Sequence, residues 1–332
     1  MDKCPGTGSY VLKVLLEKEH PEWAFDCPQR VRLWAVDDAL RATKAAKKKC
    51  FQGAGYQRLS FRSRKDIRQR FAFDKKSLGE GSIFKGKHSI EFHGYEPLPG
   101  KEDRLEGTKL VCESGRYFLI VPVKMPRKQV REPRQPCVAL DPGVRTFLTY
   151  YSEQTHGKIG EQAFQRIVRL CLRIDDLLGR MSKTTARRRY RMRKALMRMR
   201  WKVKDLINDL HWKAAVFLVT RFDVIYMPTF ETKQMSCRTT RKIRRKTVRS
   251  MLSFAFFRFK QILQHAAEMY GAKVYFVNEA YTSKTCSYCG HVQEVGGRKR
   301  FRCKNCQVDI DRDYNGARGI FLSCVAGSGL RQ

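Results

Sequence analysis

The chain has 332 residues, with 68 Lys and Arg against 32 Asp and Glu, so its formal net charge is +36. A hydrophobic content of 42% is normal for a globular protein, and the length allows two domains with separate cores. This excess of positive charge predicts a polyanionic partner, most commonly nucleic acid. A membrane-surface protein is the alternative, but the sequence has no apolar run of about 18 residues and no apolar signal sequence. We therefore expect no membrane partner.

The first half of the chain predicts a helix followed by a small β domain. Asp26-Cys27-Pro28 is a typical helix start, and apolar residues continue at helical spacing to about Lys48. From Phe51 to Met125 the pattern has period two with frequent glycine, which predicts strands. The expected strands cover 59–61, 71–73, 89–92, 109–112 and 117–121. We therefore predict a helical segment at 1–50 and a β-barrel or sandwich at 51–125.

The second half predicts an α/β fold. The segment 126–136 carries three prolines and no apolar pattern, so it is the predicted linker. Beyond it, apolar runs predict strands at 137–140, 146–151, 224–227 and 274–277, and helices at 162–181, 199–217, 252–270 and 313–322. This order is typical of an RNase H-like α/β layer over 137–332, with a helical insertion at 162–220.

Four cysteines predict a metal site. Cys286, Cys289, Cys303 and Cys306 are spaced C-x2-C, thirteen residues, C-x2-C. Thiolates at this spacing form two knuckles that close a tetrahedral zinc site. We expect one structural zinc in a ribbon over 282–310, and because four ligands leave no open position, the chemistry must lie elsewhere. The other eight cysteines are expected to be reduced thiols.

A basic run lies between the two long predicted helices. Ten basic residues in 187–204 interleave with two aromatic residues. A solvated helix face is the ordinary interpretation of a charge run, but the aromatic residues favour phosphate contact and base stacking. The predicted nucleic-acid contacts are Arg187, Arg188, Arg189, Tyr190, Arg191, Arg193, Lys194, Arg198, Trp201 and Lys202.

Two aspartates are candidates for a catalytic metal site. Asp141 follows a buried strand, where the sites of open α/β sheets lie, and Asp313 opens the final helix. Each has a simpler interpretation, a turn aspartate for Asp141 and a helix N-cap for Asp313. Metal-dependent phosphodiester cleavage needs several carboxylates converging on one point, with two Mg²⁺ ions clamping the attacking and leaving oxygens. The joint occurrence of both aspartates around this strand order favours that chemistry.

Several motifs resemble a known family. Val138 to Arg145 (VALDPGVR), Tyr281 to Gly290 (YTSKTCSYCG), Cys303 to Cys306 (CKNC) and Asp313 to Arg318 (DYNGAR) resemble the RuvC nuclease of the TnpB-type transposon proteins. Those are RNA-guided DNA endonucleases related to type V CRISPR effectors. The resemblance covers about 137–322. The first half fits the family's helical recognition lobe and wedge barrel in layout only.

The departures from the family pattern concern a catalytic glutamate. In the TnpB pattern the second central strand ends in a glutamate, where this chain has Pro228. Before Tyr-Thr-Ser the pattern usually has proline, where this chain has Glu279. This resembles the rearranged site of Fanzor proteins, the eukaryotic and viral relatives of TnpB. The resemblance implies Mg²⁺ held by Asp141, Glu279 and Asp313, and Glu231 is the alternative glutamate.

The resemblance also implies partners. We expect a monomeric ribonucleoprotein in which a guide RNA pairs with a double-stranded DNA target and the protein checks a short adjacent motif. The location would be nuclear in a eukaryote and cytoplasmic otherwise. Two alternatives remain: a nucleic-acid-binding protein of the same fold whose nuclease site is dead, and a transposase that joins DNA with the same carboxylates.

Overall fold

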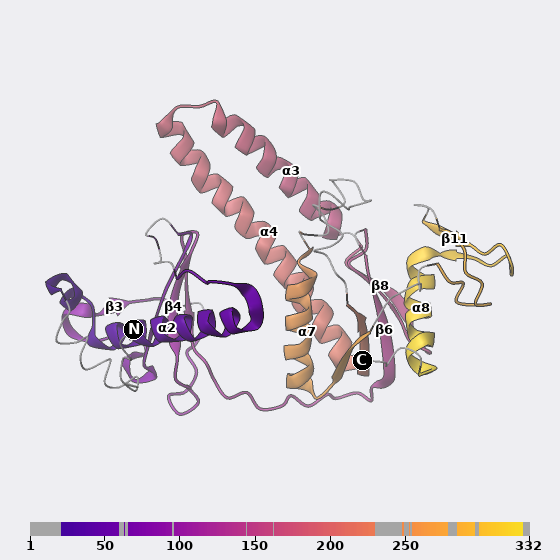
Figure 1. The fold of residues 1–332 in the computed structure, drawn as a ribbon, viewed down its shortest axis with the longest axis horizontal. Helices are drawn as coiled ribbons and strands as arrows, with labels where there is room; N and C mark the ends of the chain where they lie inside the picture. The colour runs from indigo at the N-terminus through magenta and orange to yellow at the C-terminus, as the bar shows by residue number, and fades with distance from the viewer. Residues whose placement is uncertain are drawn as a thin grey trace. The chain divides into compact units, whose positions relative to one another are not determined.

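The computed structural model describes residues 21–59, 63, 66–94, 96–143, 145–161, 163–229, 248, 252, 254–277, 284–295 and 299–327. The chain divides into two compact units, Met1–Met125 and Pro126–Gln332 (Figure 1). Among the described residues, no helix is both long and apolar enough to span a bilayer.

The first unit consists of one long helix and a small sheet. Helix α2 (Gln29–Lys49) begins behind Pro28, whose fixed φ suits a helix start. The antiparallel sheet has the order β1 (Arg68–Phe73), β4 (Thr108–Glu113), β5 (Arg116–Ile120). A two-stranded ribbon, β2 (Ser82–Ile83) and β3 (Ile90–Glu91), lies between β1 and β4 in sequence. Short helical turns cover Glu22–Asp26, Cys50–Ala54, Lys75–Ser77 and Gly86–His88.

One prediction for the first unit, the β-barrel, is not confirmed by the described residues. The helix and the strands at 71–73, 89–92, 109–112 and 117–121 lie close to their expected places, but the described strands form an open three-stranded sheet and a separate ribbon rather than a closed barrel. The strand expected at 59–61 falls mostly outside the described residues. Trp34 donates its indole N–H to Asp74 at 2.8 Å, which fixes the helix beside the sheet.

The second unit is built on a five-stranded sheet with the order β10-β9-β6-β7-β8. The strands are β6 (Gln135–Pro142), β7 (Leu148–Tyr151), β8 (His156–Ile159), β9 (Phe222–Pro228) and β10 (Lys273–Val277). β6, β9 and β10 are parallel to one another, β7 runs antiparallel to β6, and β8 runs antiparallel to β7. The element order is the RNase H-like one predicted, and β8 is an additional strand that the sequence pattern did not indicate.

The two faces of the sheet bury different cores. Val138 and Leu140 of β6 join a large cluster with residues of α4 (Ala186–Arg221) and α7 (Phe256–Tyr270). Ala139 points to the opposite face and packs with Ile320 and Phe321 of α8 (Arg312–Val325). Figure 1 shows α7 and α8 on opposite sides of the sheet. Because side chains alternate along a strand, Asp141 shares the α8 face with Ala139.

A long helical hairpin, α3 (Ala163–Ser182) with α4, projects from this unit (Figure 1). Its outer part has a small core of its own, in which Ile174, Leu177 and Met181 of α3 meet Leu196 of α4. The lower part of α4 enters the main core of the sheet. Residues 284–295 and 299–311, called the ribbon below, include the short pair β11 (Arg300–Arg302) and β12 (Asp309–Asp311).

Candidate functional site

Three parallel strands end in one row beside Asp141. In the β6–β9 register Ala139 lies opposite Tyr226, so two residues further along Asp141 comes level with Pro228. Pro228 in turn lies opposite Val277 at the end of β10. The carboxyl ends of parallel strands in an open sheet are where α/β proteins place their sites. The proline therefore occupies a position next to Asp141, and the chain leaves β10 beside that proline.

The start of α8 brings Asp313 to the same corner. Asp311 is the N-cap residue, and its carboxylate accepts the backbone N–H of Asp313 at 2.9 Å. Lys158 on β8 donates to Asp311 at 2.7 Å and so ties the sheet edge to the helix start. Because Asp311 performs the capping, the simpler interpretation of Asp313 as an N-cap is wrong. The Asp313 side chain remains available for another role in the first turn.

Asp141 lies directly against this helix. A Cβ atom built on Gly316 would be 2.6 Å from Oδ2 of Asp141. Asp313 is three residues before Gly316, and side chains at this spacing share a helix face with their Cβ atoms about 5–6 Å apart. The Asp141 carboxylate therefore lies within roughly 9 Å of the Asp313 Cβ atom. The structure thus brings together the two aspartates that the sequence singled out, although they are 172 residues apart (313 − 141).

The electrostatics of the corner suit a cation. Burial first, and then the Asp311 carboxylate, raise the pKa of Asp313 above its ordinary value despite nearby basic side chains. Partial burial is the largest influence on Asp311 and acts to raise its pKa, but the hydrogen bond and charge of Lys158 and the backbone N–H groups of Asp313 and Tyr314 together outweigh it and hold that pKa low. A buried carboxylate beside a second carboxylate is stabilised by a bound cation. Hard oxygen ligands of this kind fit Mg²⁺. Glu279 and Glu231 lie outside the described residues.

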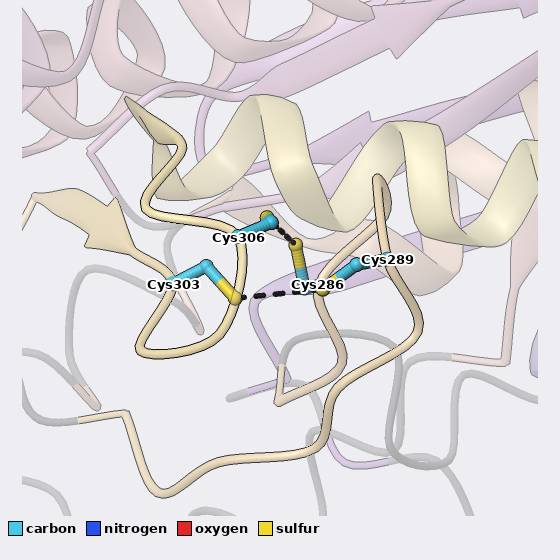
Figure 2. A group of neighbouring side chains, drawn as sticks. All are labelled: Cys286, Cys289, Cys303 and Cys306. Atoms are coloured by element: carbon cyan, nitrogen blue, oxygen red, sulfur yellow. Dashed lines mark hydrogen bonds between the residues drawn. The ribbon is translucent and has the colours of Figure 1, made fainter.

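The four cysteines converge as predicted (Figure 2). Their sulfur atoms all lie within 4.8 Å of one another, with 3.7 Å between Cys286 and Cys306 and 3.6 Å between Cys289 and Cys303. Four sulfurs around one zinc at Zn–S distances of about 2.3 Å would be about 3.8 Å apart. Hydrogen bonds, first of all from the backbone N–H of His291, lower the pKa of Cys289 to about 6, whereas the pKa of Cys306, hydrogen-bonded to the other three thiols, is raised. The site fits a structural zinc, and among the described residues it is the one cluster of three or more metal-ligating side chains.

Helix α8 holds the first cysteine knuckle. The fully buried Asn315 accepts the backbone N–H of Ser287 at 2.9 Å and donates to the carbonyl of Thr285 at 2.9 Å. Arg318 donates to the Ser287 carbonyl, and its guanidinium lies 4.1 Å from the centre of the Tyr288 ring. The cysteine site is therefore bound to the helix that carries Asp313 through four named contacts.

The basic run forms the outer part of α4, and two of its ten predicted nucleic-acid contacts, Trp201 and Arg189, have other roles in this structure. Most of its charged side chains are exposed, as is Tyr190. Trp201 is only 6% exposed, so the prediction that its ring stacks on nucleic acid is wrong for this structure. Arg189 is half-buried and donates to the carbonyls of Met181 and Thr184, so it closes the end of α3. The exposed candidates are Arg187, Arg188, Tyr190, Arg191, Arg193, Lys194, Arg198 and Lys202.

Four residues of the site were not assigned from the sequence. Asn315, Gly316 and Arg318 lie inside the DYNGAR motif, so their neighbourhood was visible but their partners were not. Lys158 lies on the unpredicted strand β8, and no local pattern links it to Asp311. A side chain whose role is set by a partner more than a hundred residues away leaves no periodic signal.

Comparison with known proteins supports the resemblance. Residues 256–320 match the family model "Cas12f1-like, TNB domain". A TnpB-like protein of Acanthamoeba polyphaga mimivirus is 29% identical over 217 residues, which are 63% of this chain and 41% of that protein. A putative transposase of Paramecium bursaria Chlorella virus 1 is 28% identical over 92% of this chain and 71% of its own length. The chain thus spans well under half of the mimiviral relative.

The fold has a counterpart among solved structures. A chain from the Cas12f1–sgRNA–target DNA complex superposes with a TM-score of 0.55 over 87% of this chain and 71% of its own, at 13% identity. At that identity the likeness concerns the fold alone. The curated relatives and the domain match do not single out the Fanzor branch. The sequence matches thus make this chain similar to TnpB-like viral proteins and, over residues 256–320, to the TNB domain of Cas12f1-like proteins.

Proposed function

We propose that the protein is an RNA-guided DNA endonuclease of the Fanzor kind. The observation that carries this proposal is that Asp141 and Asp313 meet at the carboxyl ends of the parallel strands. Pro228, at the end of the neighbouring strand β9, lies beside Asp141. Relatives named RNA-guided DNA endonuclease support the class, such as InsQ of Escherichia coli, 32% identical over 77 residues.

Each residue of the corner has a distinct task. Asp141 and Asp313 provide hard oxygen ligands, and Lys158 with Asp311 keeps the first turn of α8 in place. Two Mg²⁺ ions held there would supply the positive charge that stabilises the attacking and leaving oxygens during phosphodiester hydrolysis. The zinc ribbon has a structural task, since four cysteines leave no position for a substrate.

The third metal ligand in this proposal is Glu279. It follows Val277 by two residues, and Val277 is the partner of Pro228, where the TnpB pattern has its glutamate. A glutamate that enters the corner from the neighbouring strand end would replace the one lost at position 228. This substitution of one strand end for another is the basis for the Fanzor assignment.

The proposed partners are a guide RNA and a double-stranded DNA target. The net charge of +36 favours a nucleic-acid partner, and the exposed basic side chains of α4 form a phosphate-binding face. A similar fold occurs in a Cas12f1 complex with sgRNA and target DNA, and this likeness supports RNA and DNA as the proposed partners. We further propose a monomeric ribonucleoprotein, with base pairing reading the sequence.

The test compares four single variants in a complex with the co-purified guide RNA. Asp141→Asn, Asp313→Asn and Glu279→Gln should each slow DNA cleavage by roughly a thousandfold or more, while target binding is retained. Glu231→Gln is the matched control and should stay within about tenfold of the native rate. If Glu231→Gln abolishes cleavage and Glu279→Gln does not, the glutamate has not moved and the Fanzor assignment fails.

Two rival functions have their own outcomes in the same assay. A dead nuclease would bind target DNA under guide control without cleaving it, at every Mg²⁺ or Mn²⁺ concentration. A transposase is suggested by the Chlorella virus relative, which is named a putative transposase, and it would yield joined strand-transfer products in place of simple hydrolysis. Guide-dependent cleavage products without joining would exclude both.

A further inference from the structure

Gly316 is an unexpected residue for its place in α8. Glycine inside a helix is less stable than alanine by roughly 0.5–1 kcal/mol. Gly316 nevertheless lies buried in the second turn, between the helix and strand β6. A Cβ atom there would be 2.6 Å from Oδ2 and 3.3 Å from Cγ of Asp141. Real Cβ atoms do not approach other atoms at 2.6 Å, so any larger residue must displace the carboxylate.

The packing of α8 on β6 sets this close approach. Along the strand, Cys137, Ala139 and Asp141 share one face because side chains alternate. Along the helix, Gly316, Ile320 and Cys324 share one stripe because they are four residues apart. Ala139, Ile320 and Cys324 belong to one buried cluster, and Cys137 packs against it. Helix and strand therefore run in opposite directions in a fixed register, with Gly316 opposite Asp141.

We propose that Gly316 is a positioning residue for Asp141. Its missing side chain provides the room in which the carboxylate lies against α8, one turn from Asp313. The hydrophobic register behind it holds the backbone, so the carboxylate is the part that must move when the room is filled. The inference rests on the proposed function in one respect: the displaced group is taken to be a metal ligand.

The structure supplies a matched control in Gly179. This glycine lies in helix α3, is exposed, and has no atom within 4 Å of a Cβ built on it. Gly179→Ala should therefore show the ordinary gain of a helical alanine, a rise of about 2–4 °C in the unfolding midpoint. Gly316→Ala should fall short of that rise, because its methyl group meets Asp141.

The first experiment is a double-mutant cycle in thermal unfolding of the zinc-loaded full chain. Gly316→Ala is compared in the native background and with Asp141→Ala, which removes the obstacle. The expected result is a larger rise in the midpoint with Asp141→Ala, close to that of Gly179→Ala. Equal shifts in both backgrounds would overturn the proposal, because the two residues would then not interact. This readout needs neither metal nor activity.

The second experiment measures Mn²⁺ binding to the RNA-free, zinc-loaded chain. Gly316→Ala should weaken binding at least tenfold without lowering the unfolding midpoint, whereas Gly179→Ala should leave both binding and DNA cleavage unchanged. Loss of binding in Asp141→Asn but not in Gly316→Ala would reject the positioning role and leave the proposed function intact. Native binding by Asp141→Asn would instead contradict the metal assignment of Asp141 and, with it, the consequence drawn here for Gly316.

Discussion

The ribbon with α8 and the hairpin of α3 and α4 are both rich in charge, but they hold it differently. Around α8 several polar groups have specific partners, such as Asn315 with the backbone of Ser287 or Lys158 with Asp311. On the outer hairpin most basic side chains are exposed. The role of the first region depends on where each polar group lies, whereas the role of the second depends on its total positive charge. The two should therefore respond to substitution in different ways.

The largest effect is expected from the zinc site. Cys303→Ser should lose one zinc equivalent and most DNA cleavage, because a structural zinc contributes directly to folding free energy. Zinc content by mass spectrometry and cleavage by gel assay provide the measurements. Normal cleavage by a zinc-free protein would show that α8 holds Asp313 without the ribbon.

Asn315→Ala sharpens the same comparison because it leaves the cysteines intact. It leaves the N–H of Ser287 and the carbonyl of Thr285 without their partner, which typically costs about 1–3 kcal/mol for each buried group. We expect the protein to retain zinc but to unfold at a lower temperature and to cleave more slowly. If this variant keeps native cleavage, the two hydrogen bonds of Asn315 stabilise the ribbon but are not needed to position Asp313.

The hairpin should respond to total charge. Replacing Arg187, Arg188, Arg191 and Arg193 by glutamine should weaken RNA binding, and each lost phosphate contact should reduce the slope of log affinity against log salt by about 0.7–0.9. The losses should accumulate steadily with each substitution. An unchanged salt slope would mean that this run is only a solvated face.

Arg189→Gln is the control within that run. Its guanidinium donates to the carbonyls at the end of α3, so we expect a loss of stability with little change in the salt slope. A change in slope as large as that for its exposed neighbours would contradict the distinction between structural and binding arginines.

These contrasts also mark how far the sequence alone could go. The positions of Asp141 and Asp313 were predictable, because Asp141 ends a strand and Asp313 begins a helix whose apolar patterns are strong. The burial of Trp201 was not, because a 3-4 repeat does not tell which aromatic residue of a basic helix faces its partner helix. Gly316 belongs to a motif that the sequence showed, but its close contact with the Asp141 carboxylate could not be predicted, because the fold brings that carboxylate from a distant strand.

The base of the hairpin differs from its tip, and pH should reveal the difference. His211 on α4 is fully buried and bonds through Nε2 to the carbonyl of Phe254 at 2.8 Å, between the rings of Phe147 and Phe259. Burial is the main cause that lowers its pKa to about 4. The unfolded chain binds this proton near pH 6.5, so stability should fall as the pH drops from 6.5 towards 4, by about 3 kcal/mol in all.

Denaturant unfolding at several pH values measures that loss. His211→Gln keeps an N–H donor but cannot titrate, so its stability should depend less on pH across this window. His265→Gln, at an exposed position on α7, is the matched control and should keep the native pH dependence. A native pH dependence in His211→Gln would assign the effect to other groups.

The smallest effect concerns the two knuckles of the ribbon. The residue after the second cysteine is left-handed in both, with φ of 75° at Gly290 and 57° at Gln307. Such a φ is unstrained for glycine but costs other residues about 1–2 kcal/mol. Gln307→Gly should therefore stabilise the zinc-loaded protein by about 1 kcal/mol, since the exposed hydrogen bond from its side-chain amide to the Lys304 carbonyl contributes little.

The reverse substitution in the first knuckle, Gly290→Gln, should destabilise the protein by a similar amount, because nothing lies within 4 Å of its added Cβ and only the backbone is strained. Equal and opposite shifts in the denaturation midpoint would show that the two knuckles are held by the same backbone geometry. A neutral Gln307→Gly would mean that the contacts of Asn315 and Arg318 with the first knuckle already set the stability of the whole ribbon.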